Sequence, residues 1–124
     1  MKKWPCLLLL LALSCTKQDL GSDCKSLQEG ITSNDVNKVN SSISKFIAEL
    51  SYKTHTSENL TSLAQKISAS CSVNVDVLCY GCINTLPAQS ELTVSFSSAG
   101  TTVTKVIDIS ESSSKEMKFV NMHD

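Results

Sequence analysis

The chain has 124 residues, a length that fits one domain with a modest hydrophobic core. Its formal net charge is −1, no arginine occurs among its eleven basic side chains, and only 5% of its residues are aromatic. Nucleic-acid binding is therefore not expected. The chain lacks arginine forks for phosphate, a basic patch and enough aromatic rings for base stacking.

The first residues have the pattern of an export signal. Lys2 and Lys3 form a positive start, an apolar run covers residues 4–13, and the small Ser14 precedes Cys15. The apolar run is about half of the ~20 residues that a membrane-spanning helix needs. We therefore expect a cleaved signal rather than a permanent membrane span.

The segment Ala12-Leu13-Ser14-Cys15 resembles the lipobox of bacterial type II signal peptides, with Ala12 where leucine is usual. The resemblance implies that residues 1–14 are a lipoprotein signal peptide and that Cys15 carries acyl chains such as palmitate. Two or more chains anchor a protein stably to a bilayer. Residues 15–22 would be a lipidated tether and 23–124 a single domain in the cell envelope, with the outer membrane as the expected site, on its periplasmic or surface face. The alternative is an ordinary signal peptide that leaves Cys15 as a free thiol.

Two or three helices are predicted in the first part of the domain. Apolar spacing indicates a helix of one to two turns from Cys24 to Ile31, and a second helix over 36–50 that Thr32 or Ser33 caps. Thr56 is predicted to cap a third helix that ends at Cys71. The short connection between the second and third helices predicts an antiparallel pair. His55 in this connection, and His123 near the other end of the chain, are expected to be solvated.

After Cys71 the apolar period changes to two, which is typical of half-buried strands. The first strand has Val73, Val75, Val77 and Cys79 on one face, and Tyr80-Gly81 interrupts it. Three further strands are predicted over 92–96, 103–109 and 117–122, with polar turns between them. The fold class is therefore α+β, with the helices packed on one face of a four-stranded antiparallel meander.

Four cysteines remain beyond the tether and predict two disulfides in an exported domain, namely Cys24, Cys71, Cys79 and Cys82. In a regular strand, residues i and i+3 lie about 10 Å apart on opposite faces, too far apart for a bridge. Gly81 would have to turn the chain for Cys79 to pair with Cys82, and Cys24 would then pair with Cys71. A crossed pattern remains open. No metal site is expected, because zinc sites of the ribbon type use two closely spaced cysteine pairs and only one such pair is present. No cofactor is expected.

The segment from Cys79 to Glu91 resembles part of a group of small uncharacterised bacterial envelope proteins, which implies the envelope class and no particular activity. No serine stands in a nucleophile-elbow pattern, and no catalytic residue is expected. We expect a non-enzymatic binding or structural module, attached to the bilayer through Cys15, with a possible protein partner. One alternative is an inhibitor of a periplasmic hydrolase that presents the loop Ile83–Ser90. A less favoured one is a thiol-disulfide oxidoreductase using Cys79 and Cys82, because the helix that such a pair requires is not predicted.

Overall fold

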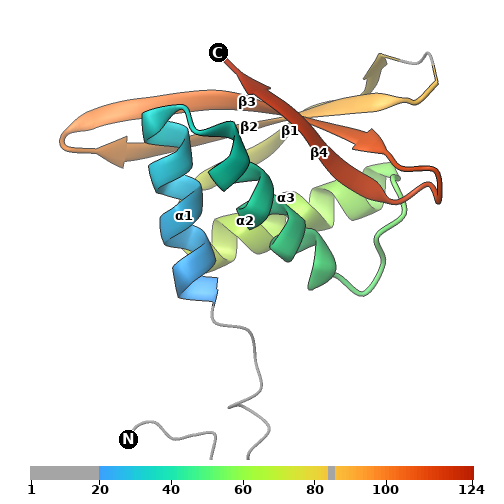
Figure 1. Cartoon of the computed structure of the whole chain (residues 1–124), viewed down its shortest axis with the longest axis horizontal. Helices are drawn as coiled ribbons and strands as arrows, with labels where there is room; N and C mark the ends of the chain where they lie inside the picture. Colours follow the sequence, from blue (N-terminus) through green and yellow to red (C-terminus); the bar gives the residue numbers. More distant parts are fainter. Residues whose placement is uncertain (1–19, 84–85) are drawn as a thin grey trace, which may run out of the picture.

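The computed structural model describes residues 20–83 and 86–124. The expected signal peptide at 1–14, the acylation of Cys15 and most of the tether lie outside the described residues. Three helices precede four strands, and the helices cover one face of the sheet, which confirms the α+β class (Figure 1). The elements are α1 (Leu20–Ser33), α2 (Val36–Ala48), α3 (Ser57–Cys71), β1 (Asn74–Ile83), β2 (Gln89–Ser98), β3 (Thr101–Glu111) and β4 (Met117–His123).

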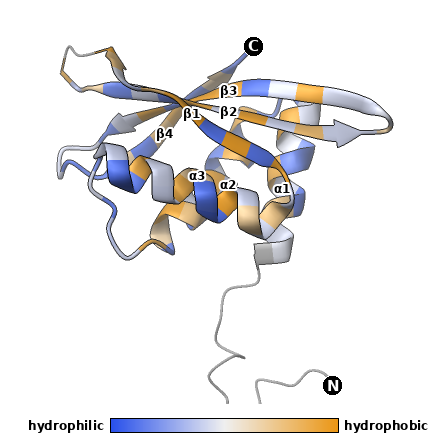
Figure 2. Cartoon of the chain, turned by 180° about the vertical axis from the view of Figure 1, so that it is seen from behind, coloured by the Kyte–Doolittle hydropathy of each residue, from blue (hydrophilic) through white to orange (hydrophobic). Residues whose placement is uncertain are grey.

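The sheet is an antiparallel meander in the order β1-β2-β3-β4. Figure 2 shows hydrophobic and hydrophilic residues alternating along its strands. The side chains that face the helices close the core together with the apolar stripes of all three helices, as the periodicities predict. In the described part of the chain, no helix has both the length and the apolar character needed to cross a membrane.

The first helix is longer than predicted and begins at Leu20, inside the segment expected to be tether. The disulfide between Cys24 and Cys71 joins the start of α1 to the end of α3. This bridge holds the first turns of α1 against the end of α3, and the apolar spacing within α1 does not predict the extra turn. Gly30 lets α1 approach α2 closely, because a Cβ at that position would lie 2.8 Å from Cγ2 of Val39.

The caps of α2 and α3 differ in how well they were predicted. Thr56 caps α3, as expected, by accepting a hydrogen bond from the Asn59 N–H at 3.1 Å. The cap of α2 is Asp35, which accepts from the Lys38 N–H at 3.2 Å, so the prediction of Thr32 or Ser33 was wrong. Both hydroxyls lie within α1 and donate to carbonyls one turn earlier in that helix.

The helices also pack differently from the predicted antiparallel pair. The main neighbours of α2 are α1 and β4, whereas α3 packs on β1. Consequently α2 and α3 meet only over a short stretch. The connection between them instead reaches the sheet, because Thr54 forms an isolated antiparallel bridge with Glu116.

A bulge in β1 overturns the predicted placement of Cys79. Val77 lies opposite Leu92, but Cys79 lies opposite Glu91, so Leu78 is an extra residue on this strand. Beyond the bulge the faces exchange, and Cys79 lies on the face away from the helices. The strand also continues through Tyr80 to Ile83 rather than stopping at Tyr80-Gly81.

The two disulfides follow the first of the patterns considered from the sequence. Cys24 pairs with Cys71 and Cys79 with Cys82, with Cα–Cα distances of 5.2 and 5.7 Å. Gly81 has a φ of +64°, which supplies the turn that the second pairing requires. No cysteine is free in the parts of the chain that the structure describes.

Candidate functional site

The β1–β2 hairpin carries an unusual share of the exposed apolar surface. Seven large hydrophobic side chains are exposed over residues 20–83 and 86–124, and four of them lie between positions 78 and 86. They are Leu78, Tyr80, Ile83 and Leu86, with exposed fractions of 54%, 46%, 49% and 84%. The ends of β1 and β2 next to this turn extend beyond the helical layer (Figure 1). We refer to these four side chains as the hairpin patch.

A buried hydrogen-bond network lies behind the hairpin patch and holds it in place. His55 Nε2 is 2.8 Å from the hydroxyl oxygen of Ser90, and His55 Nδ1 is 3.4 Å from a carboxylate oxygen of Glu111. The Gly81 N–H donates to the same Ser90 oxygen at 2.9 Å. The Tyr80 hydroxyl donates to the His55 carbonyl, and the centres of the two rings are 5.1 Å apart. The network therefore fastens the hairpin to the connection between α2 and α3.

His55 is 3% exposed, so the expectation that it is solvated was wrong. The reason lies in the start of β4. The His55 N–H donates to the Lys115 carbonyl, and the Met117 N–H donates to the Lys53 carbonyl, both at 2.8 Å. These bonds draw the connection onto the end of the sheet. No local pattern signals this contact, because the partners are about 60 residues apart in the chain.

Ser90, His55 and Glu111 have the order of side chains found in a serine-hydrolase triad. Their surroundings do not suit that chemistry. Ser90 is completely buried, so an acyl substrate has no access to its oxygen. Moreover, the Gly81 N–H points at the serine oxygen itself rather than at a position where an oxyanion would form. With the proton on Nδ1 of His55, each donor in the network has an acceptor, as a structural network requires.

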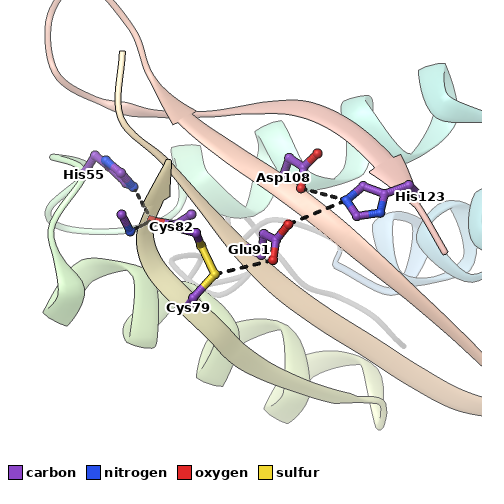
Figure 3. The surroundings of a disulfide bond; sticks show 8 residues. His55, Cys79, Cys82, Glu91, Asp108 and His123 are labelled. Atoms are coloured by element: carbon purple, nitrogen blue, oxygen red, sulfur yellow. Dashed lines mark hydrogen bonds and ion pairs between the residues drawn. A yellow bond between two sulfur atoms is a disulfide. The ribbon is translucent and has the colours of Figure 1, made fainter. Parts of the chain in front are cut away.

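A row of polar and sulfur-containing side chains crosses the face of the sheet opposite the helices (Figure 3). It consists of the Cys79–Cys82 disulfide on β1, Glu91 on β2, Asp108 on β3 and His123 on β4. Their neighbours Leu92, Ile107 and Met122 are buried in the core, so alternation along the strands turns the row outward. We refer to these residues as the outer row.

The contacts in the outer row are close. His123 Nε2 lies 3.0 Å from Oδ1 of Asp108 and 3.8 Å from Oε2 of Glu91. Cys79 Sγ lies 3.4 Å from Oε1 of Glu91. Because this sulfur belongs to a disulfide and carries no hydrogen, the last contact is van der Waals and electrostatic. His123 was expected to be solvated; its side chain is 42% exposed but also partnered.

Charge in the outer row alters the titration of His123. The hydrogen bond that His123 donates to the Asp108 carboxylate raises the pKa of His123 above its ordinary value, and the bond to the backbone oxygen of Asp124 raises it further. Asp124 itself pairs with Lys105, and this hydrogen bond lowers the pKa of the Asp124 carboxyl group. The sequence does not show the contacts of His123 with Asp108 or of Lys105 with Asp124, because both join different strands or strand ends.

Two open surface hollows of about 550 and 500 Å³ lie elsewhere on the molecule. One lies between the C-terminal end of α2 and α3. The other lies between α1 and the C-terminal end of β2. Neither is lined by a residue of the hairpin patch or of the outer row, and neither adds a site of distinctive chemistry.

Fold and site together define a small α+β domain with two disulfides and a projecting apolar hairpin. No family model, no curated protein and no solved structure matches the chain.

Proposed function

We propose that the protein is a lipid-anchored lipoprotein of the cell envelope whose domain binds a protein partner through the hairpin patch. One observation carries the binding proposal, namely the concentration of exposed apolar side chains on a single hairpin. Several large apolar side chains left exposed on one hairpin commonly mark a surface that a partner covers. Tyrosine and large aliphatic side chains are also suited to anchoring an interface.

The surroundings of the hairpin patch favour binding because they restrict its motion before a partner arrives. The Cys79–Cys82 bridge closes the chain around Gly81, and the Ser90 hydroxyl accepts the Gly81 N–H. A preorganised loop loses less conformational entropy on binding than a mobile one. The hydrogen bonds of the buried Ser90 and His55 thus favour binding by holding the hairpin in one conformation.

The proposal of a lipid anchor is based on the sequence of residues 2–15. Its positive start, apolar run and lipobox-like end favour acylation of Cys15. The pairing of Cys24, Cys71, Cys79 and Cys82 is consistent with an oxidising compartment outside the cytoplasm.

A narrower candidate function is inhibition of a hydrolase. Of the loop Ile83–Ser90 that such an inhibitor would present, Ile83 ends β1, Gln89 and Ser90 begin β2, and residues 84–85 lie outside the described residues. Leu86, the most exposed large side chain of the hairpin patch at 84%, lies between the two strands and would be the residue inserted into a cleft. The oxidoreductase alternative has less support. The pair lies in a strand rather than at a helix N-terminus, where the chemistry of such a pair would be favoured.

A crosslinking experiment in the native host tests the binding proposal. A photoreactive amino acid replaces Leu86 in the full chain, and a matched control carries it at Tyr52, which is 75% exposed on the connection after α2. We expect one discrete protein adduct from position 86, none from position 52, and loss of the adduct when Ile83→Ser is added. Adducts of equal yield and pattern from both positions would refute a specific role for the hairpin patch.

The anchor is tested separately. Intact-mass analysis of the protein from the native host should find a chain that begins at Cys15 and carries acyl groups. The Cys15→Ser variant should be released from the membrane fraction. A mature chain that begins elsewhere without lipid would refute the anchor while leaving the binding result to stand.

A further inference from the structure

Three side chains with metal-binding atoms meet on the outer face of the sheet. Glu91, Asp108 and His123 each offer one ligand atom, and these atoms all lie within 4.8 Å of one another. They come from three adjacent strands, β2, β3 and β4, and Figure 3 shows their side chains directed toward a common point. The group is independent of the hairpin patch and of the binding role proposed for it.

Strand register holds these ligands in place. Glu91 lies directly opposite Asp108 in the β2–β3 ladder. In the β3–β4 ladder, His123 lies opposite Val106, which is one step along the same face from Asp108. Ladder hydrogen bonds fix all three backbones, so the ligands do not depend on a loop for their positions.

The carboxylates of Glu91 and Asp108 repel each other in the folded state. Directly opposed side chains on neighbouring antiparallel strands are close, and two negative charges there are destabilising. The imidazole of His123, when protonated, places a positive charge beside both carboxylates. Its Nε2 lies 3.0 Å from Oδ1 of Asp108 and 3.8 Å from Oε2 of Glu91. A divalent cation between the three side chains would neutralise both carboxylates with more charge than one imidazolium provides.

The second ring nitrogen of His123 has a partner outside the group. Nδ1 lies 3.2 Å from the backbone oxygen of Asp124, and a proton on Nδ1 donates to that oxygen. Histidines that bind metals characteristically donate from the other ring nitrogen to a carbonyl or carboxylate, which fixes the tautomer and the ring orientation. This contact leaves Nε2, the atom facing Asp108 and Glu91, to act as a ligand.

We propose that Glu91, Asp108 and His123 form a binding site for a divalent transition-metal ion of the zinc type. Imidazole nitrogen together with two carboxylate oxygens suits zinc better than magnesium or calcium, which prefer oxygen ligands alone. The ion displaces the proton on Nε2 of His123, which leaves to solvent. Solvent fills the remaining coordination positions. The neighbouring sulfurs are not ligands while Cys79 and Cys82 are bonded to each other.

Titration calorimetry with Zn²⁺ on the untagged full chain in detergent, with both disulfides intact, tests the site. We expect saturation at about one ion per chain, and His123→Ala and Glu91→Gln should each weaken binding at least ~10-fold, since loss of even outer-shell partners costs about 10–100-fold. The control Asp76→Asn removes an exposed carboxylate opposite Thr93 on the same sheet and should bind as the unmodified chain does.

An NMR titration supplies a second measurement. Zn²⁺ should shift the imidazole signals of His123 and leave those of the buried His55 unchanged. Mg²⁺ at the same concentration should shift neither. The proposal is overturned if Zn²⁺ fails to saturate the unmodified chain, or if the His123→Ala and Glu91→Gln variants bind it as tightly as that chain. The Leu86 crosslink should be retained in His123→Ala, because partner binding through the hairpin patch does not require the metal site.

Discussion

Removing the two disulfides one pair at a time should separate a bridge that stabilises the fold from one that shapes the hairpin. Cys24 and Cys71 are 47 residues apart in the chain, whereas Cys79 and Cys82 are three apart. Restriction of the unfolded chain grows with the logarithm of loop length. On that basis the long loop contributes about 4 kcal/mol to the free energy of unfolding and the short loop about 2 kcal/mol.

The assay is urea unfolding of the full chain in detergent, followed by far-UV circular dichroism, for the unmodified protein and for the two double alanine variants. The Cys24→Ala/Cys71→Ala variant should lose about twice as much free energy of unfolding as the Cys79→Ala/Cys82→Ala variant. Equal losses, or a larger loss for the 79/82 pair, would refute the reasoning. A cooperative urea transition of the 79/82 variant would show that it is folded, and any loss of its Leu86 crosslink would then report on hairpin shape rather than on unfolding.

Three further substitutions test the packing and the polar contacts. Gly30→Ala should destabilise the protein by about 1–3 kcal/mol in urea unfolding, because the added methyl would lie 2.8 Å from a buried side chain of α2, and this clash outweighs the gain in helix propensity. Ser90→Ala should cost about 2–4 kcal/mol in the same assay, since it leaves Nε2 of the buried His55 and a backbone N–H without their partner; a change below ~0.5 kcal/mol would contradict the network. Asp108→Asn should lower the pKa of His123 measured by NMR, because it removes the largest cause of the raised value. The stability from this contact is fully present below the unfolded-state pKa of His123 and is lost as pH rises through the folded-state pKa. The stability advantage of the unmodified protein over Asp108→Asn should therefore shrink as pH rises and reverse at high pH, where neutral His123 leaves the opposed carboxylates of Glu91 and Asp108 uncompensated.

The features predicted correctly are those that local spacing determines. The stripe on α3 from Leu60 to Cys71 is buried, and the alternation of Leu92, Val94 and Phe96 places all three in the core. Both patterns depend only on the period of the backbone, 3.6 residues for the helix and two for the strand. The order of helices and strands then determines the α+β class.

The features missed depend on contacts between distant segments. The Asp35 cap is an exception with a local cause: α1 continues through Thr32 and Ser33, whose hydroxyls bond back to carbonyls of α1, so Asp35 caps α2 instead. His55 is buried because the turn before β4 pairs with the connection that contains it. For His55 the sequence contains a residue that can be buried with partners, but only tertiary structure selects those partners.

The bulge at Leu78 shows how far one such event reaches. Had strict alternation continued, Cys79 would share the inner face with Val77, and its sulfur would lie in the core away from Glu91. The extra residue reverses the two faces at Cys79 and Tyr80, and a second register shift follows between Cys79 and Ile83. It turns Cys79 toward Glu91 in the outer row and turns Tyr80 toward His55 in the buried network. The two irregularities of β1, one at Leu78 and one around Gly81, therefore position the disulfide that closes the hairpin and the ring of Tyr80. This is why the period-two pattern predicts the strand but not the site.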